Sequence, residues 1–209
     1  MLRTNLKAAI FAATVAAAVI APAAAASAAS ATVTDGTGDV WENTYNPDTS
    51  SDVWTPTESA YNTDVVSTVI KHNLNRVSIK MTYNDLQKQP DVSISAVVNM
   101  RFDQGPRRFA FVDASPGSWR GSSQVFKDNA KTGPAPVSCA GLSHTVDYAA
   151  NTVTMSIPRT CLGSPRWIEA NVLSRSTGGL NQDVQRNLFD NGQRAGHGDG
   201  GWSARLRRG

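Results

Sequence analysis

The sequence has few cysteines, few aromatic residues and only one long apolar stretch. Its 209 residues include 2 cysteines and 3 histidines, and aromatic residues make up 7% of the chain. The apolar stretch, residues 8–20, is shorter than the roughly 20 residues that a helix needs to cross a bilayer. Neither the G-x-S-x-G nor the H-E-x-x-H motif occurs, and the histidines are isolated in the sequence. These absences argue against a membrane span and against the common serine-hydrolase and zinc-protease sites.

The beginning of the chain predicts export from the cell. Arg3 and Lys7 precede the apolar stretch, and a run of small residues follows Pro22. This order is typical of a secretory signal peptide. We expect the signal within residues 1–31, with cleavage between residues 26 and 31, and a single domain over residues 32–209. Both Ala26-Ser27-Ala28 and Ala29-Ser30-Ala31 suit signal peptidase, and an uncleaved anchor is the alternative.

Charge is balanced overall but unevenly placed. Without Arg3 and Lys7, the chain keeps 18 of its 20 Lys and Arg against 17 Asp and Glu. A nearly neutral mature chain has no general attraction to nucleic acid. Residues 32–64 nevertheless hold seven carboxylates and no Lys or Arg, whereas residues 104–209 hold 13 basic and 7 acidic residues.

Alternating apolar and polar residues predict an all-β protein. In 76–84 ("RVSIKMTYN") and 92–103, every second residue is apolar, as in a strand with one buried face. Short strands separated by Gly, Pro, Asn and Asp favour an antiparallel two-sheet β-sandwich, jelly-roll-like in type. We expect residues 32–62 to form a long polar lead-in loop and residues 175–200 a glycine-rich loop. Further strands are predicted at 64–72, 107–113, 143–148, 152–158, 166–174 and 201–208.

The two cysteines predict one disulfide bond. An exported protein meets an oxidising environment, where an even number of cysteines is usually paired. A Cys139–Cys161 bond would close the base of the hairpin formed by 143–148 and 152–158, contributing about 3 kcal/mol on the chain-entropy account. The alternative, a catalytic thiol at Cys161 with His144 as its base, is rarer in secreted proteins.

Four segments carry a resemblance to known proteins: "DGTGDVW", "NTDVVSTVIKHNLNRVSIKMTYNDL", "DYAANTVTMSIPRTCLGSPRWIEANV" and "ARLRRG". Together they resemble small secreted proteins of high-GC Gram-positive bacteria. More distantly, the chain is similar to the β-sandwiches of carbohydrate-binding module family 9 and of DOMON-like domains. In those domains an Asp-x-x-x-Asp entrance commonly supports a calcium ion, and the matching stretch here runs from Asp35 to Asp39. The resemblance implies no activity.

The carboxylates of the lead-in segment are candidate ligands for Ca²⁺, which takes six to eight oxygen ligands. We expect Asp35, Asp39 and Asp64 to form the metal site, with glycines freeing backbone carbonyls between them. The spacing is not that of an EF-hand. A solvated acidic loop without metal is the alternative, and no other cofactor is expected.

Aromatic residues outside the strongest strands are candidate ligand-binding residues. Trp41, Trp54, Tyr61 and Trp119 could stack on sugar rings, or they could fill gaps at the sheet edges. We therefore expect a secreted, non-catalytic binding or structural module, stabilised by calcium and able to bind an extracellular glycan or cell-wall polymer. An envelope-associated adhesive protein and a secreted hydrolase using two carboxylates remain the alternatives. The sequence does not indicate the oligomeric state.

Overall fold

The computed structural model describes residues 29–46, 51–57, 61–181, 184–192 and 201–209. Residues 1–28, which hold most of the expected signal peptide, lie outside the described residues. No helix among the described residues is long and apolar enough to cross a membrane.

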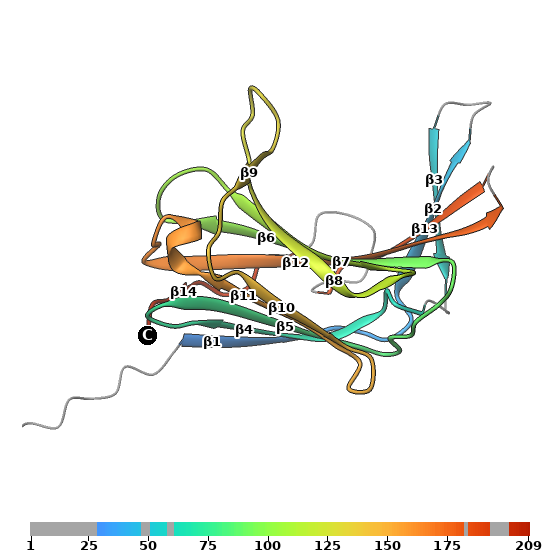
Figure 1. The fold of residues 1–209 in the computed structure, drawn as a ribbon, viewed down its shortest axis with the longest axis horizontal. Helices are drawn as coiled ribbons and strands as arrows, with labels where there is room; N and C mark the ends of the chain where they lie inside the picture. The colour runs from blue at the N-terminus through green and yellow to red at the C-terminus, as the bar shows by residue number, and fades with distance from the viewer. Residues whose placement is uncertain (1–28, 47–50, 58–60, 182–183, 193–200) are drawn as a thin grey trace, which may run out of the picture.

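Two antiparallel sheets pack face to face, as the sequence predicts (Figure 1). The smaller sheet has the strand order β1-β4-β5-β11-β10, and the larger has the order β3-β2-β13-β12-β6-β7-β8-β9, with β14 paired to β12. The smaller sheet consists of β1 (Ala29–Thr34), β4 (Val65–His72), β5 (Arg76–Tyr83), β10 (Ser143–Asp147) and β11 (Thr152–Pro158). The larger sheet consists of β2 (Val40–Asn46), β3 (Ser51–Thr57), β6 (Val92–Phe102), β7 (Arg108–Ser115), β8 (Ser118–Lys127), β9 (Ala135–Val137), β12 (Trp167–Asn181), β13 (Val184–Asp190) and β14 (Leu206–Arg207).

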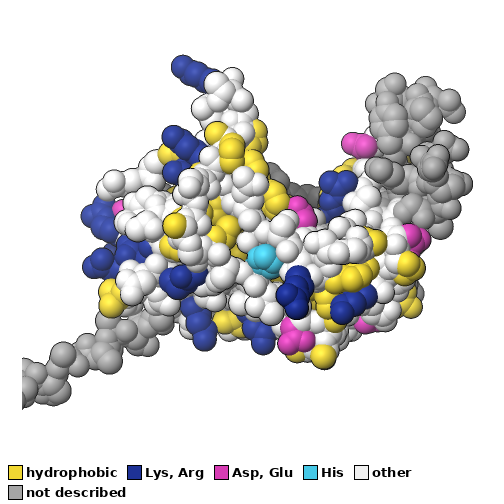
Figure 2. All heavy atoms as spheres, viewed as in Figure 1, with side chains coloured by type: hydrophobic (Ala, Val, Ile, Leu, Met, Phe, Trp, Pro, Cys, Tyr) yellow, Lys and Arg dark blue, Asp and Glu magenta, His cyan; other side chains and the backbone are white. Residues whose placement is uncertain are grey.

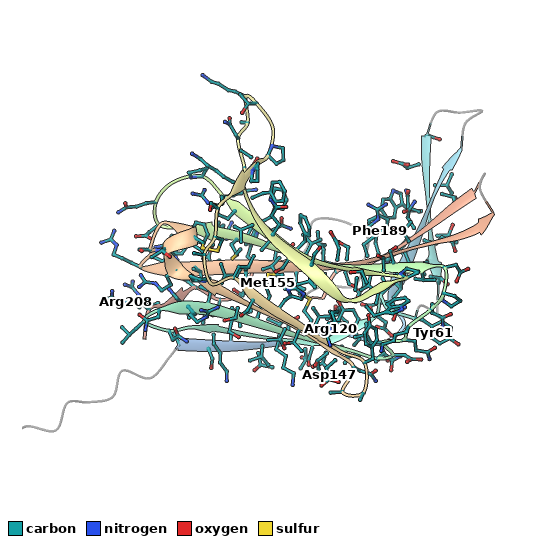
Figure 3. The ribbon with its side chains drawn as sticks, viewed as in Figure 1. Tyr61, Arg120, Asp147, Met155, Phe189 and Arg208 are labelled. Atoms are coloured by element: carbon teal, nitrogen blue, oxygen red, sulfur yellow. A yellow bond between two sulfur atoms is a disulfide. The ribbon has the colours of Figure 1, made fainter. Side chains whose placement is uncertain are left out.

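The core fills the space between the two sheets. It is built from the alternate, inward-facing residues of each strand, such as Ile79 on β5 and Val98 on β6, both fully buried. Met155 lies between the sheets (Figure 3) and is also fully buried. Tyr83 and Ser174 place hydroxyl groups in the core, with Ser174 Oγ 3.3 Å from Tyr83 Oη. The alternation that predicts the strands is therefore the alternation that builds the core.

The disulfide is present between Cys139 and Cys161. Cys161 lies in the short 3₁₀ helix η1 (Arg159–Leu162), which follows β11. Cys139 lies in the segment that passes from β9 of the larger sheet to β10 of the smaller sheet. The bond therefore holds a crossing between the two sheets, and Cys161 is not a free thiol.

Two polar segments form more regular structure than the sequence predicts. The expected lead-in loop contains the end of β1 and all of β2 and β3, and the expected glycine-rich loop contains the end of β12 and all of β13. These strands lie at sheet edges or in the arm formed by β2, β3 and β13, which rises from one end of the larger sheet (Figure 1). Because they bury little apolar surface, their sequences lack the strong alternation of β5 and β6.

Candidate functional site

Four aspartates gather where the chain passes between the sheets. Asp35 and Asp39 lie in the segment from β1 to β2, and Asp64 immediately precedes β4. Asp190 is the last residue of β13 and faces inward. Two crossings and one strand end therefore bring carboxylates from four positions to one end of the sandwich.

The carboxylates are close enough to share a cation. Asp35, Asp39 and Asp190 each place one oxygen within 4.8 Å of the others. Asp64 lies beside them, and its negative charge contributes to raising the pKa of each of the three. Asp64 and Asp190 are both 3% exposed, so water compensates little of their charge.

Local hydrogen bonds hold one side of the cluster in place. Asp64 Oδ2 accepts hydrogen bonds from the Gly38 backbone at 3.0 Å and from Asn84 Nδ2 at 3.1 Å. The Gly38 φ of 76° is a left-handed conformation that glycine adopts without strain, and it turns this N–H toward Asp64. Asp190 Oδ2 accepts from the Val65 backbone at 2.5 Å, which links the larger sheet to the first residue of β4.

The other oxygen of each carboxylate has no such partner. Asp35 Oδ2, Asp39 Oδ1, Asp64 Oδ1 and Asp190 Oδ1 are buried and accept no hydrogen bond from any described residue. A buried polar atom without a partner is costly, and it is rare in folded proteins. Four such atoms in one cluster fit a site that binds a cation.

The pKa values show the same unbalanced charge. Burial, followed by the charges of its neighbours, raises the pKa of Asp35 to about 6. Burial raises the pKa of Asp190 to about 8, although the Val65 hydrogen bond lowers it and Asp35, Asp39 and Asp64 raise it further. Burial also raises the pKa of Asp39. Without a cation, this site therefore favours protonated carboxyl groups.

The sequence identified three of these four aspartates and missed Asp190. The structure brings together Asp35 and Asp39, as the resemblance to domains with an Asp-x-x-x-Asp entrance implies, with Asp64 next to them. Asp190 was missed because it lies in a segment predicted to be a loop. The available signal was the alternation in "NLFD" (187–190), where Leu188 and Asp190 point to the same buried side of a strand.

The four predicted ligand-binding aromatics fall in different places. Trp41 on β2 pairs in register with Phe189 on β13, so both lie on the face of the larger sheet that is turned away from the smaller sheet, here called the outer face. Trp54 on β3 lies on the same face, with its ring centroid 5.1 Å from that of Phe189. Figure 3 shows Phe189 on this side of the sheet.

The other two aromatics are separate from this group. Trp119 on β8 packs edge-on against Tyr148 at 5.9 Å, where an edge of the larger sheet meets the β10–β11 hairpin. Tyr61 is 50% exposed, between β3 and β4. The four residues therefore do not form one platform, and only Trp41 and Trp54 share a face.

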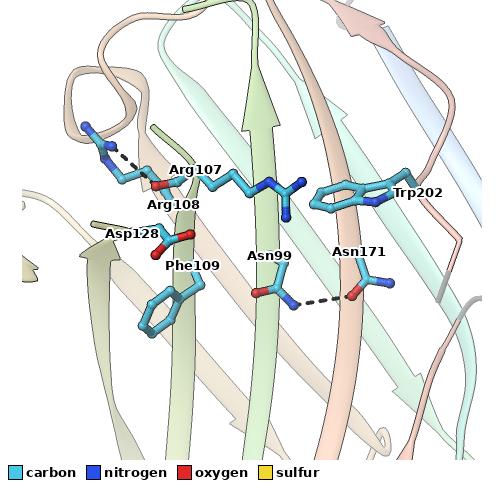
Figure 4. A pocket seen from close by; sticks show the side chains of 7 residues that line it. All are labelled: Asn99, Arg107, Arg108, Phe109, Asp128, Asn171 and Trp202. Carbon is cyan, nitrogen blue, oxygen red and sulfur yellow. Dashed lines mark hydrogen bonds between the residues drawn. The ribbon is translucent and has the colours of Figure 1, made fainter. Parts of the chain in front are cut away.

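The outer face has two hollows that the sequence did not predict. The first, the Trp202 hollow, has a volume of about 260 Å³ and lies over β6, β7 and β12 (Figure 4). Its lining includes the amides of Asn99 and Asn171, the rings of Phe109 and Trp202, and the charged groups of Arg107 and Asp128. The second, the Arg175 hollow, has a volume of about 570 Å³ and is lined on the same strands by Ser95, Phe111, Asp113, Arg175 and Thr177, among others.

Searches against protein-family models, curated proteins and solved structures give no match. The protein is therefore classified by the architecture of its own structure. It is an antiparallel two-sheet β-sandwich with a disulfide at one crossing between the sheets and an acidic cluster at two others.

Proposed function

We propose that this chain is a secreted, non-catalytic carbohydrate-binding module whose sheets are joined at one end by a calcium ion. The observation that carries the calcium site is the set of four aspartates, each with a buried oxygen that no described residue satisfies. Asp35, Asp39 and Asp190 would bind the ion directly, and Asp64 would complete the charge around it.

The chemistry of the cluster favours calcium over other common metal ions. All four side chains offer carboxylate oxygen, which hard cations prefer, whereas zinc sites in proteins usually contain cysteine or histidine. Mg²⁺ requires a near-ideal octahedron of short bonds and keeps several water molecules. Ca²⁺ accepts the irregular geometry of carboxylates and carbonyls supplied by separate segments.

Metal binding itself is the first test. Isothermal titration calorimetry of the mature protein at pH 7.5, after removal of metal with chelator, should show one Ca²⁺ site with much weaker response to Mg²⁺. Asp190→Asn keeps an oxygen to accept the Val65 hydrogen bond but removes a negative charge, so it should weaken Ca²⁺ binding about tenfold or more. Asp113→Asn, an exposed carboxylate on β7, is the matched control and should leave the affinity unchanged. Unchanged calcium affinity in Asp190→Asn and Asp39→Asn would refute the site.

Carbohydrate binding is supported by the aromatic residues of the outer face. Trp41, Trp54 and Phe189 present rings from three neighbouring strands, and the guanidinium of Arg175 lies 5.4 Å from the centroid of Phe189. Flat aromatic surfaces beside hydrogen-bonding groups suit sugar rings, which have apolar faces and polar edges. Trp41→Ala should abolish binding in a glycan array, whereas Trp119→Ala should not, because Trp119 lies away from this face.

A further inference from the structure

The outer face of the larger sheet is shaped as a concave surface. Figure 2 shows it hollowed between the side of the molecule that carries β9 and the arm formed by β2, β3 and β13. Both hollows open on this surface and use the same three central strands, β6, β7 and β12. Asn99 in one and Ser95 in the other are four residues apart on β6, a separation of about 13 Å along a strand.

We infer that the two hollows form one extended site for a neutral polysaccharide, and that a chain of several sugar units contacts both at once. This inference rests on the carbohydrate-binding function proposed above. It extends that function from Trp41 and Trp54 to the whole concave face, and it specifies a chain rather than a single sugar as the ligand.

An apolar strip joins the hollows. Leu173, Val97 and Phe111 are in register across β12, β6 and β7 and point outward. Phe126 on β8 stacks on Phe111 at 5.5 Å and on Phe109 at 5.1 Å, the second pair being nearly parallel with an interplanar angle of 4°. All of these side chains are only partly buried, although they lie on the side of a sandwich that normally carries polar residues. The strip therefore offers a flat apolar surface to the faces of sugar rings.

The Trp202 hollow supplies hydrogen bonds of both kinds. Asn99 Nδ2 donates to Asn171 Oδ1 at 3.3 Å, and Asn171 Nδ2 donates to the Gly201 carbonyl at 3.0 Å. These bonds fix the two amides at the base of the hollow, between Phe109 and Trp202 (Figure 4). Sugar hydroxyl groups both donate and accept, so an ordered pair of amides with charged groups nearby is a suitable recognition surface.

The rim of this hollow is held by cation–π contacts. The guanidinium groups of Arg101 and Arg107 lie 4.5 and 5.6 Å from the Trp202 ring. Arg101 also pairs with Glu169, which accepts a second ion pair from Arg205 at 3.3 Å. Trp202 is therefore fixed in place before any ligand arrives, which reduces the entropy lost on binding.

The face carries charges of both signs in each hollow. Arg107 and Arg108 share the Trp202 hollow with Asp128, and Arg175 shares the other hollow with Asp113. A polyanion such as nucleic acid or a polyuronate would meet a carboxylate in each hollow. Neutral hydroxyl groups can hydrogen-bond to the arginine and to the aspartate alike.

The experiment measures binding of the mature, calcium-loaded protein to soluble polysaccharides by affinity electrophoresis. Xylan, mixed-linkage β-glucan, galactomannan and soluble starch are the neutral probes, and polygalacturonate and polyphosphate are the charged ones. At least one neutral chain should retard the protein, and calorimetry with its oligomers should show affinity rising with length until the chain spans both hollows. Binding restricted to polyanions, or no binding to any probe, would overturn the inference.

Substitutions in each hollow test whether they act together. Asn99→Ala and Phe111→Ala should each weaken binding of long chains about tenfold or more. The two variants should differ from each other in their affinity for short oligomers. Lys80→Ala, on the exposed side of the smaller sheet, is the control and should bind normally. Equal loss at every chain length would show a single-sugar site, and no loss in either variant would place the site elsewhere.

These results separate the extended site from the calcium proposal. If Ca²⁺ binds at the aspartates but no neutral polysaccharide is retained, the metal site stands and the extended site fails. If a neutral chain binds but depends on Trp41 alone, the carbohydrate function stands and the two-hollow site fails.

Discussion

The two ends of the sandwich are fastened in different ways. At one end, a covalent bond joins Cys139, in the crossing from β9 to β10, to Cys161 after β11. At the other end, the crossings from β1 to β2 and from β3 to β4 bring together carboxylates that repel one another. The strand register places these features apart, because Pro158 pairs with Arg76 at the start of β5, whereas Asp64 precedes Val65, which pairs with Tyr83 at its end. The first fastening needs only oxidation, whereas the second, on the proposal made above, needs a bound cation.

Calcium should have the largest effect on this comparison. At a free Ca²⁺ concentration one thousand times its dissociation constant, a bound ion stabilises the folded state by about 4 kcal/mol. For a chain of this size we expect the melting temperature to rise roughly 8–16 °C between chelated and calcium-saturated protein. Differential scanning calorimetry measures this shift, and Asp39→Asn should abolish most of it. If the melting temperature is the same in chelator as in calcium, the acidic end does not depend on calcium, and the proposed difference between the two ends is wrong.

Loss of the disulfide should have the next largest effect. Its cysteines are separated by 22 positions, so the variant Cys139→Ser/Cys161→Ser should lose about 3 kcal/mol, or roughly 6–12 °C. The calcium-induced shift should persist in this variant, because distant sites contribute independently. A calcium shift that disappears without the disulfide would show that the two ends are coupled.

The pH dependence of the calcium-free protein should be opposite to that of most proteins. Asp190 has a pKa of about 8 when folded, against 3.8 as the ordinary value, and Asp35 has a pKa of about 6. Folding therefore binds protons, and stability in chelator should rise as the pH falls from 8 toward 4. Denaturant titrations at several pH values test this, with Asp190→Asn flattening the slope. If the free energy of unfolding instead decreases as the pH falls, the repulsion inferred at this end is contradicted.

His72 should give the smallest effect, with the opposite sign, at the disulfide end. Nδ1 of this fully buried histidine donates to the Leu206 carbonyl at 3.0 Å. Burial lowers its pKa, the Leu206 hydrogen bond and Asp103 oppose the lowering, and Arg159 and Arg208 add to it. The contribution of the neutral His72 ring to the free energy of unfolding is fully present above pH 6.5, and it decreases as the pH falls toward the folded-state pKa. His72→Asn, which can still donate to Leu206, should lose this dependence in calcium-saturated protein.

The sequence predicted most of the centre of this fold and little of its edges. β5 and β6 were predicted because their inward residues are large and alternate strictly, as packing between two sheets requires. β8 was missed because its sequence, SWRGSSQVFK, buries only Val125 completely, and because Gly121 interrupts the alternation beside a register shift in the β7–β8 pair. β3 contains Pro56, which is acceptable only because β3 is an edge strand.

The candidate site likewise contains residues that the local sequence reveals and residues that only strand pairing brings together. Asp35 and Asp39 are four residues apart, so local spacing reveals them, and Asp64 follows from its position before a strong strand. Asp190 joins them through pairing between β13 and β12. The alternation in residues 187–190 indicates that this side chain is buried, but it does not indicate which strand lies beside it. The Trp202 hollow was missed for the same reason, since Asn99 and Asn171 are neighbours only through the β6–β12 register.

The first strand constrains where the predicted signal peptide should be removed. Ala29, Ser30 and Ala31 pair with His72, Lys71 and Ile70, and the side chains of Ala29 and Ala31 contact the core. Cutting after Ala31 would discard half of this edge strand, whereas cutting after Ala28 would keep all six residues. If the chain is exported as proposed, we expect intact mass analysis of the mature protein to show a chain beginning at Ala29, so that removal of the signal peptide leaves the six described residues of this edge strand in place.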